Sequence, residues 1–293
     1  MVLGLAAALG AAAAFGVAAL LQALAARREA PVEGVDPRLL VRMLRSPAFV
    51  VALVLNLVGF GLHVLALRSL PLFLTQAAIS SSVVVTALLS RAVLHVALAR
   101  REHLAVLGVG VGVTLLAATS AHAGEDVPST AFRWALLGAA AAVAAVGTVV
   151  GRLHSRLGVS LLGLTGGLGF AVVAVATRSL PDLAPSTLVA DPATYALLLG
   201  GGVGFLLYAT ALQRAAVMVA TSTMVLGQTV APAVVGVVLL GDGTRSGAGV
   251  LAVAGLALAV GGAAALARYD PHLLSTSPAD APSGQVVPAR RRP

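Results

Sequence analysis

Nine long apolar stretches limit the folds open to this chain more than any other feature of its sequence. An apolar segment of about 20 residues crosses the roughly 30 Å hydrocarbon core of a bilayer as a helix, because each residue rises about 1.5 Å. A helix also satisfies its own backbone hydrogen bonds in lipid, which isolated strands and loops do not. The sequence therefore predicts an all-α integral membrane protein. We expect about nine transmembrane helices, at 2–26, 47–67, 71–90, 104–122, 134–151, 158–177, 194–212, 215–240 and 247–267.

The composition excludes several classes of soluble protein. Hydrophobic residues make up 59% of the chain and charged residues only 10%, where a soluble domain carries about a quarter charged. All 19 basic residues are arginines, and they lie in short polar breaks, so the net charge of +8 is loop charge. No charged domain is present to carry a nucleic-acid-binding face. The absence of cysteine excludes disulfides, thiol nucleophiles and Cys-ligated metals.

The arginines predict the orientation of the chain in the membrane. If the connections alternate between the two sides, fifteen arginines lie on one side, against Arg68, Arg133, Arg178 and Arg245 on the other. Loop arginines are retained on the cytoplasmic side during insertion. We therefore expect a protein of the cytoplasmic (plasma) membrane with its N-terminus outside and its C-terminus in the cytoplasm. The tail at 270–293 is rich in Pro, Ser and Ala, and this composition predicts disorder.

A nine-residue stretch occurs twice. Residues 59–67 read GFGLHVLAL, and 145 positions later residues 204–212 read GFLLYATAL. Each copy is followed by a span with scattered polar residues, a charged break (ARREH or GDG) and a glycine-rich span. Spans one to four therefore match spans six to nine. The predicted units are a first repeat at 1–122, a linking fifth span with its loops at 123–157, a second repeat at 158–269 and the tail at 270–293.

The unpaired fifth span reverses the direction of the second copy. Two four-helix repeats joined by one central helix enter the membrane from opposite sides, so they are inverted repeats. Inverted repeats related by an axis in the membrane plane are a recurring architecture of secondary transporters, in which the halves exchange conformations to alternate access. The layout predicts a secondary transporter of a small solute.

The same layout resembles the drug/metabolite transporter superfamily, including its EamA-like members. Members of the superfamily typically have ten spans, and here the loop RREAPVEGVDPRLLVRMLRS takes the place of one span in the first half. The nine spans, the short break HSRLG before span six and the outside N-terminus are most similar to the NIPA-type magnesium transporter branch. That resemblance implies a Gly-Glu-x-x-Asn-Phe sequence in span two, but aligned on Gly59 this chain has Phe60 and His63 at the Glu and Asn positions. A hard cation such as Mg²⁺ prefers carboxylate or carbonyl oxygens. A small organic solute or a weakly hydrated cation is therefore favoured, with magnesium or another divalent cation as the alternative.

The candidate transport site consists of neutral polar residues within the predicted spans, because no Asp, Glu or Arg lies in the middle of any of them. Polar groups at membrane depth are costly and commonly functional, although Ser and Thr also serve close helix packing. His63 and Tyr208 lie near opposite interfaces, where amphipathic rings are common, so each could belong to an aromatic belt or to a cavity mouth. We expect the pocket between spans two, three, seven and eight. The predicted substrate pathway comprises Asn56, His63, Gln76, Ser80, Ser81, Tyr208, Thr221, Ser222, Gln228 and Thr229.

No sequence pattern indicates an enzyme. The chain has neither an HExxH nor a G-x-S-x-G sequence. No catalytic residue, metal ligand or cofactor is therefore expected. The predicted partners are the lipid bilayer and a small-molecule or ion substrate, with a homodimer as an open option and no nucleic acid. A non-transporting structural or accessory membrane protein is the other alternative, and it would tolerate loss of the polar groups in spans three and eight.

Overall fold

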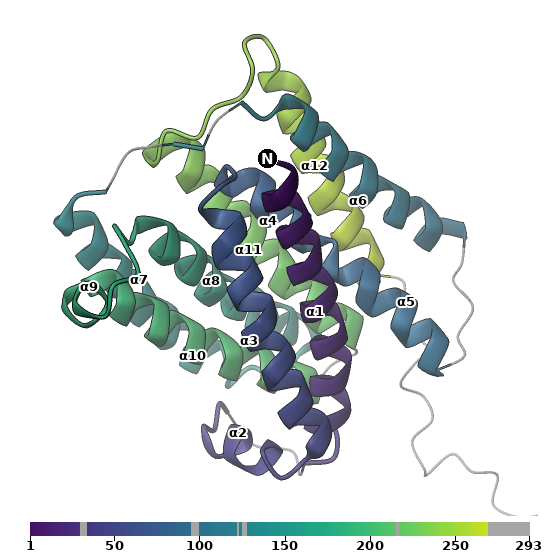
Figure 1. The fold of residues 1–293 in the computed structure, drawn as a ribbon. Helices are drawn as coiled ribbons and strands as arrows, with labels where there is room; N and C mark the ends of the chain where they lie inside the picture. The colour runs from purple at the N-terminus through teal and green to yellow at the C-terminus, as the bar shows by residue number, and fades with distance from the viewer. Residues whose placement is uncertain (30–33, 95–99, 122, 125–127, 215–216, 269–293) are drawn as a thin grey trace, which may run out of the picture.

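A computed structural model describes residues 1–29, 34–94, 100–121, 123–124, 128–214 and 217–268. The tail at 270–293 lies outside the described residues. Within them the chain folds into helices, with one isolated antiparallel bridge between Ser120 and Thr244. Figure 1 shows the helices as one bundle. They are α1 (Val2–Ala26), α2 (Arg38–Met43), α3 (Pro47–Leu67), α4 (Leu72–Ser80), α5 (Ser82–Leu94), α6 (Arg100–Thr119), α7 (Thr130–Val150), α8 (Arg156–Ser179), α9 (Pro185–Ala190), α10 (Pro192–Arg214), α11 (Val217–Leu239) and α12 (Gly249–Arg268).

Seven helical segments in the described part of the chain are long and apolar enough to cross a bilayer. This confirms the prediction of an all-α membrane protein. Two further apolar helices are shorter, His103–Thr119 and Gly249–Ala265, and they coincide with predicted spans four and nine. The seven segments are Val2–Ala26, Pro47–Leu67, Leu72–Leu89, Thr130–Val150, Leu157–Ser179, Pro192–Arg214 and Val219–Leu239.

The third predicted span, 71–90, is not one uninterrupted helix. It divides at Ser81 into α4 and α5. The hydroxyls of Ser80 and Ser81 donate to the backbone carbonyls of Ala77 and Ala78, each at 2.6 Å. Serine side chains that bond to nearby carbonyls compete with the helical ladder and bend it. The two serines therefore account for a local break that their apolar neighbours do not reveal.

The helices pack in pairs that repeat along the chain. In the first half α1 packs along α3, and in the second half α8 packs along α10. Two further pairs join the halves: α4 contacts α11, and α6 lies along α12. Figure 1 shows the α1–α3 pair near the centre of the bundle and the α6–α12 pair at its right side.

Glycines are found where two of these pairs approach most closely. A Cβ on Gly112 of α6 would lie 2.4 Å from the backbone nitrogen of Ala259 in α12. A Cβ on Gly169 of α8 would lie 2.7 Å from the carbonyl oxygen of Gly200 in α10. Small residues let membrane helices approach through their backbones, because lipid supplies no hydrophobic driving force between helices. The glycine-rich spans therefore encode helix contacts.

One end of the bundle is held together by a buried carboxylate, and we call it the Asp242 end. The fully buried Asp242 side chain accepts hydrogen bonds from the N–H groups of Leu72, at 2.5 Å, and Gly124, at 2.9 Å. The Arg178 guanidinium lies 3.9 Å from the same carboxylate and donates to the Gly124 carbonyl. The start of α4, the α6–α7 connection, the end of α8 and the α11–α12 loop therefore meet at one carboxylate.

The opposite end is organised by the end of α10, and we call it the Arg214 end. The Arg214 guanidinium donates to the carbonyl of Gly151 at 2.8 Å and to that of Gly34. Gln213 donates to the carbonyl of Ala26, the last residue of α1, at 3.4 Å. Because α3 begins at this end and α10 finishes here, the two helices run in opposite directions.

Candidate functional site

A cavity of about 470 Å³ lies among α1, α3, α4, α8, α10 and α11. Leu40 of α2 and Ser82 at the start of α5 also line it. This volume lies within the roughly 300–1,000 Å³ of small-molecule sites. The structure places six of the ten predicted site residues on its wall: Asn56, His63, Gln76, Tyr208, Thr221 and Gln228.

The other four predicted residues do not line the cavity. Ser80 and Ser81 bond to carbonyls of their own helix, as described above. Ser222 and Thr229 are buried, and within the described part of the chain their hydroxyls have no hydrogen-bond partner. Hydrogen bonds to carbonyls of α4 therefore account for Ser80 and Ser81, while the structure gives no account of the two unpaired hydroxyls on α11.

The two rings of the repeated stretch each form a hydrogen bond across the cavity wall. The Gln76 amide nitrogen lies 3.3 Å from Nε2 of His63, within hydrogen-bond distance. The Tyr208 hydroxyl lies 2.7 Å from Oγ1 of Thr221. Both rings are buried, and His63 also meets the Phe15 ring edge-on at 6.4 Å between centroids. The structure thus places both rings inside the bundle rather than in an outward-facing aromatic belt.

These two hydrogen bonds are equivalent in the sequence. Each partner lies 13 residues after its ring residue. Thr221 follows Gln76 by 145 positions, the same offset that separates Tyr208 from His63. The two copies therefore share the position of a side-chain hydrogen bond as well as part of their sequence.

The same offset relates much of the cavity wall. Every residue of α3 and α4 that lines the cavity has a counterpart 145 positions later that also lines it. All seven cavity-lining positions of α3 and α4 thus recur as cavity-lining positions of α10 and α11. The pairs are Leu53 and Leu198, Asn56 and Gly201, Leu57 and Gly202, Phe60 and Phe205, His63 and Tyr208, Gln76 and Thr221, and Ile79 and Met224.

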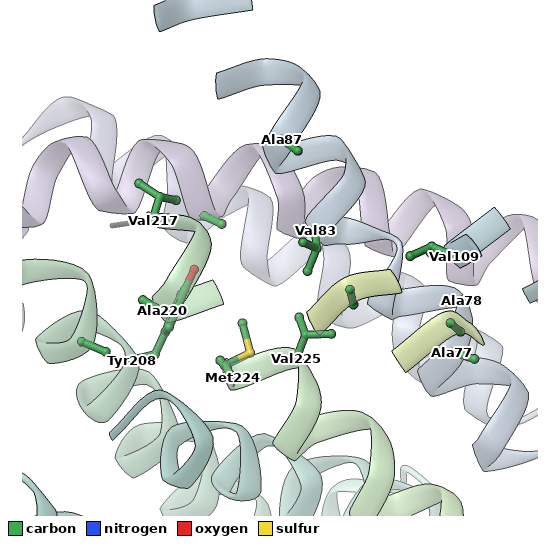
Figure 2. Close-up of a cluster of buried hydrophobic side chains, with 14 of the residues drawn as sticks. Ala77, Ala78, Val83, Ala87, Val109, Tyr208, Val217, Ala220, Met224 and Val225 are labelled. Atoms are coloured by element: carbon green, nitrogen blue, oxygen red, sulfur yellow. The ribbon is translucent and has the colours of Figure 1, made fainter. Parts of the chain in front are cut away.

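Part of this wall continues into the hydrophobic core. Tyr208 and Met224 belong to a buried cluster with Val83, Ala220 and Val225 (Figure 2). The cluster joins α5, α10 and α11, so residues of both halves support the wall of the cavity. A substitution at such a wall residue therefore also alters the packing between the two halves.

Sequence reasoning missed the aromatic character of the cavity. Four of the seven phenylalanines line it, namely Phe15, Phe60, Phe170 and Phe205. Among the described residues of the wall, none is Asp, Glu or Arg. The signal was present in the sequence, since a Gly-Phe pair opens both copies of the repeated stretch.

Two wall residues carry unpaired polar atoms. Gln22, also missed from the sequence, is only 2% exposed, and its Oε1 has no hydrogen-bond partner in the described part of the chain. The Asn56 Nδ2 is likewise buried and unpaired there. Buried polar groups are normally hydrogen-bonded, and an orphan calls for an explanation such as a ligand or water. Gln22 and Asn56 therefore each place one unpaired, buried polar atom beside the cavity, an acceptor and a donor respectively.

The described residues contain no group of three or more His, Asp or Glu side chains arranged to hold a metal ion. Comparison with protein-family models, curated proteins and solved structures gave no match to this chain.

A double-mutant cycle tests the Tyr208–Thr221 bond. Tyr208→Phe and Thr221→Val each leave one buried hydroxyl unpaired, so we expect each to lower the stability by about 1–2 kcal/mol. The double variant removes both hydroxyls and should be less destabilised than the sum of the two, by about 1 kcal/mol. Thermal unfolding in detergent micelles measures each variant.

The matched control pairs Thr221→Val with Tyr195→Phe. Tyr195 is exposed, and its hydroxyl donates to the Val189 carbonyl instead. That cycle should be additive. Additivity at Tyr208 and Thr221 as well would contradict the bond.

Proposed function

We propose that this chain is a secondary transporter that moves a small solute through the cavity by alternating access of two inverted repeats. The observation that carries the proposal is the pairing of the cavity wall at an offset of 145 residues. A cavity on a pseudo-twofold axis between two repeats is lined by equivalent residues from both. Such a position is where inverted-repeat transporters bind their substrates.

The helix arrangement supports the inverted relationship. Residues of α3 that line the cavity have their counterparts on α10, and the two helices run in opposite directions between the Asp242 end and the Arg214 end. His63 therefore lies toward the Asp242 end and Tyr208 toward the Arg214 end. In the proposed cycle, the His63–Gln76 and Tyr208–Thr221 bonds join equivalent pairs of helices at opposite ends of the substrate. The helices at one end separate while those at the other end pack more closely.

We further propose nine membrane spans, with α4 and α5 together forming span three and with α6 and α12 forming spans four and nine. The α6–α12 and α4–α11 contacts then join corresponding spans of the two repeats. This arrangement fits the resemblance to the drug/metabolite transporter superfamily. The Arg214 end carries most of the arginines, so it faces the cytoplasm of a plasma-membrane protein.

The chemistry of the wall favours an organic solute over a divalent cation. Mg²⁺ is bound through oxygen ligands and usually one or two carboxylates, whereas the described wall contains none. A non-transporting accessory protein would have no need of two unpaired polar atoms, Gln22 Oε1 and Asn56 Nδ2, beside a cavity.

Flux measurements on purified protein in liposomes test the proposal, with a panel of Mg²⁺, amino acids, nucleosides and cationic dyes offered in both directions. We expect saturable flux of an organic solute. The double variant Asn56→Ala/Gln228→Ala should reduce that flux at least about tenfold, because it removes two amides from the wall.

The matched control is Thr223→Ala on the same helix, where the hydroxyl donates to the Val219 carbonyl and the residue does not line the cavity. Its flux should stay near that of the parent protein. If no solute moves in any gradient, the transporter proposal fails. A reporter fusion that places the C-terminus outside would overturn the orientation.

A further inference from the structure

The cavity reaches the outer surface of the bundle between α3 and α10. Leu57 and Leu198 line the cavity and are also 65% and 62% exposed. Gly202, the counterpart of Leu57, is exposed in the same way. A wall residue that is open to the outside marks a passage through the wall.

The depth of this opening points to lipid rather than to water. Leu57 is the central residue of α3, and Gly202 is adjacent to the centre of α10. The middle of a spanning helix lies at the middle of the hydrocarbon core. An opening at these residues therefore faces the acyl chains of the bilayer.

The wall accepts an uncharged molecule better than a charged one. An ion moved from water into a site without a compensating charge loses its hydration, at a cost of several kcal/mol. The described wall offers four phenylalanine rings and neutral polar groups. Aromatic rings pack well against a flat apolar body.

We propose that the cavity binds an uncharged aromatic amphiphile, which enters from the bilayer between α3 and α10. Its polar edge both donates and accepts, as a carboxamide does: it donates to Gln22 Oε1 and accepts from Asn56 Nδ2, the two unpaired atoms of the wall. The proposal names the substrate class of the transporter and so rests on the proposed function.

Equilibrium dialysis against the parent protein in lipid nanodiscs tests the ligand class. Three labelled probes of similar size are compared: naphthamide, the naphthoate anion and the naphthyl-trimethylammonium cation. We expect saturable binding of naphthamide, with each charged probe at least about tenfold weaker. Tighter binding of either charged probe, including the cation on aromatic faces, would overturn the ligand class.

Two variants link binding to the unpaired atoms. Gln22→Leu and Asn56→Leu should each weaken naphthamide about tenfold, since each removes one hydrogen bond from a buried site. Thr223→Val, at a residue of α11 that does not line the cavity, should leave its dissociation constant unchanged. Unchanged binding in both Leu variants would refute the assigned contacts.

Dialysis requires no translocation, so it separates this proposal from the transporter function. Binding of naphthamide without flux of any solute would refute the proposed transport function and support the proposed binding site. Flux of a charged solute without naphthamide binding would support the proposed transport function and refute the proposed ligand class.

The entry route is tested by tryptophan quenching. The chain has one tryptophan, Trp134, so a Trp134→Phe/Phe60→Trp variant reports from the cavity alone. In bilayers of mid-chain brominated phosphatidylcholine, we expect strong quenching of this reporter and weak quenching by aqueous iodide. The opposite result would place the opening toward water and overturn the lateral route.

Two glycines supply matched controls for the route. Gly138 on α7 is exposed, and a Cβ there would meet no atom within 4 Å, so Trp134→Phe/Gly138→Trp reports full exposure to lipid. Gly202 has equally open surroundings but lines the cavity. Adding Gly202→Phe to the Phe60→Trp reporter should fill the opening and reduce bromolipid quenching. Undiminished quenching would show that lipid reaches the reporter by another path.

Discussion

Replacing Asp242 by alanine is expected to destabilise the protein by about 3–5 kcal/mol, because breaking a buried ionic contact leaves the partner groups unsatisfied. The carboxylate accepts from the N–H groups of Leu72 and Gly124 and lies near the Arg178 guanidinium. Alanine would leave both N–H groups without their acceptor and the guanidinium without its carboxylate. The midpoint of thermal unfolding in detergent micelles, followed by circular dichroism, measures the loss.

The control is Asp182→Ala at the same end of the bundle. Asp182 is exposed, and hydrogen bonds from the Thr187 side chain and the Ala184 N–H lower its pKa below the usual value. Both hydrogen bonds come from residues at most five positions further along the chain, so they do not tie distant segments together, and we expect a much smaller change in the unfolding midpoint. Equal effects of the two substitutions would show that Asp242 is not the tie between helices described above.

Gly112→Ala is expected to separate α6 from α12 and to cost about 2–3 kcal/mol, within the range for overpacked interiors. The new methyl group would lie 2.4 Å from the Ala259 nitrogen and 2.6 Å from the Gly255 carbonyl oxygen. Both are backbone atoms, so no side chain can rotate to make room. The unfolding midpoint should fall, and a cysteine pair placed across the two helices should cross-link more slowly.

Gly110 provides the control within the same helix. It lies two residues before Gly112, and a Cβ there would meet no atom within 4 Å. Gly110→Ala should leave the stability unchanged or raise it slightly, because alanine has the higher helix propensity. If both substitutions were tolerated alike, the close contact between α6 and α12 would be refuted.

The fold was predictable to the extent that apolarity defines it. The predicted spans 2–26 and 47–67 coincide with α1 and α3, since long uncharged runs have only one stable form in lipid. The break at Ser81 was not predictable from apolarity, because it depends on hydroxyls that compete for backbone carbonyls. The helices α2 and α9 were also not predicted, because six residues are too few to give a periodic hydrophobic pattern.

For the candidate site, the sequence indicated which polar residues could lie in the membrane but not the cavity that brings them together. Asn56 and Gln228 were identified because large amides are costly at depth. Phe170 was not, since an apolar letter does not say whether it faces lipid, a neighbouring helix or a cavity. The repeated offset could have identified Gly201 as a wall residue, because it is the counterpart of the candidate Asn56.

The tie at Asp242 also bears on how the chain matures during synthesis. Leu72, whose N–H opens α4, precedes its acceptor by 170 residues. A ribosome must therefore translate nearly all of the apolar helices before the first half can satisfy this donor. Until then the nascent first half has an incomplete end, and closing so long a loop is entropically slow. The loop between α11 and α12 thus supplies the hydrogen-bond acceptor for the start of α4. A chain that stops short of residue 242 therefore leaves the Leu72 N–H in the first half without its partner, besides lacking the end of the second half.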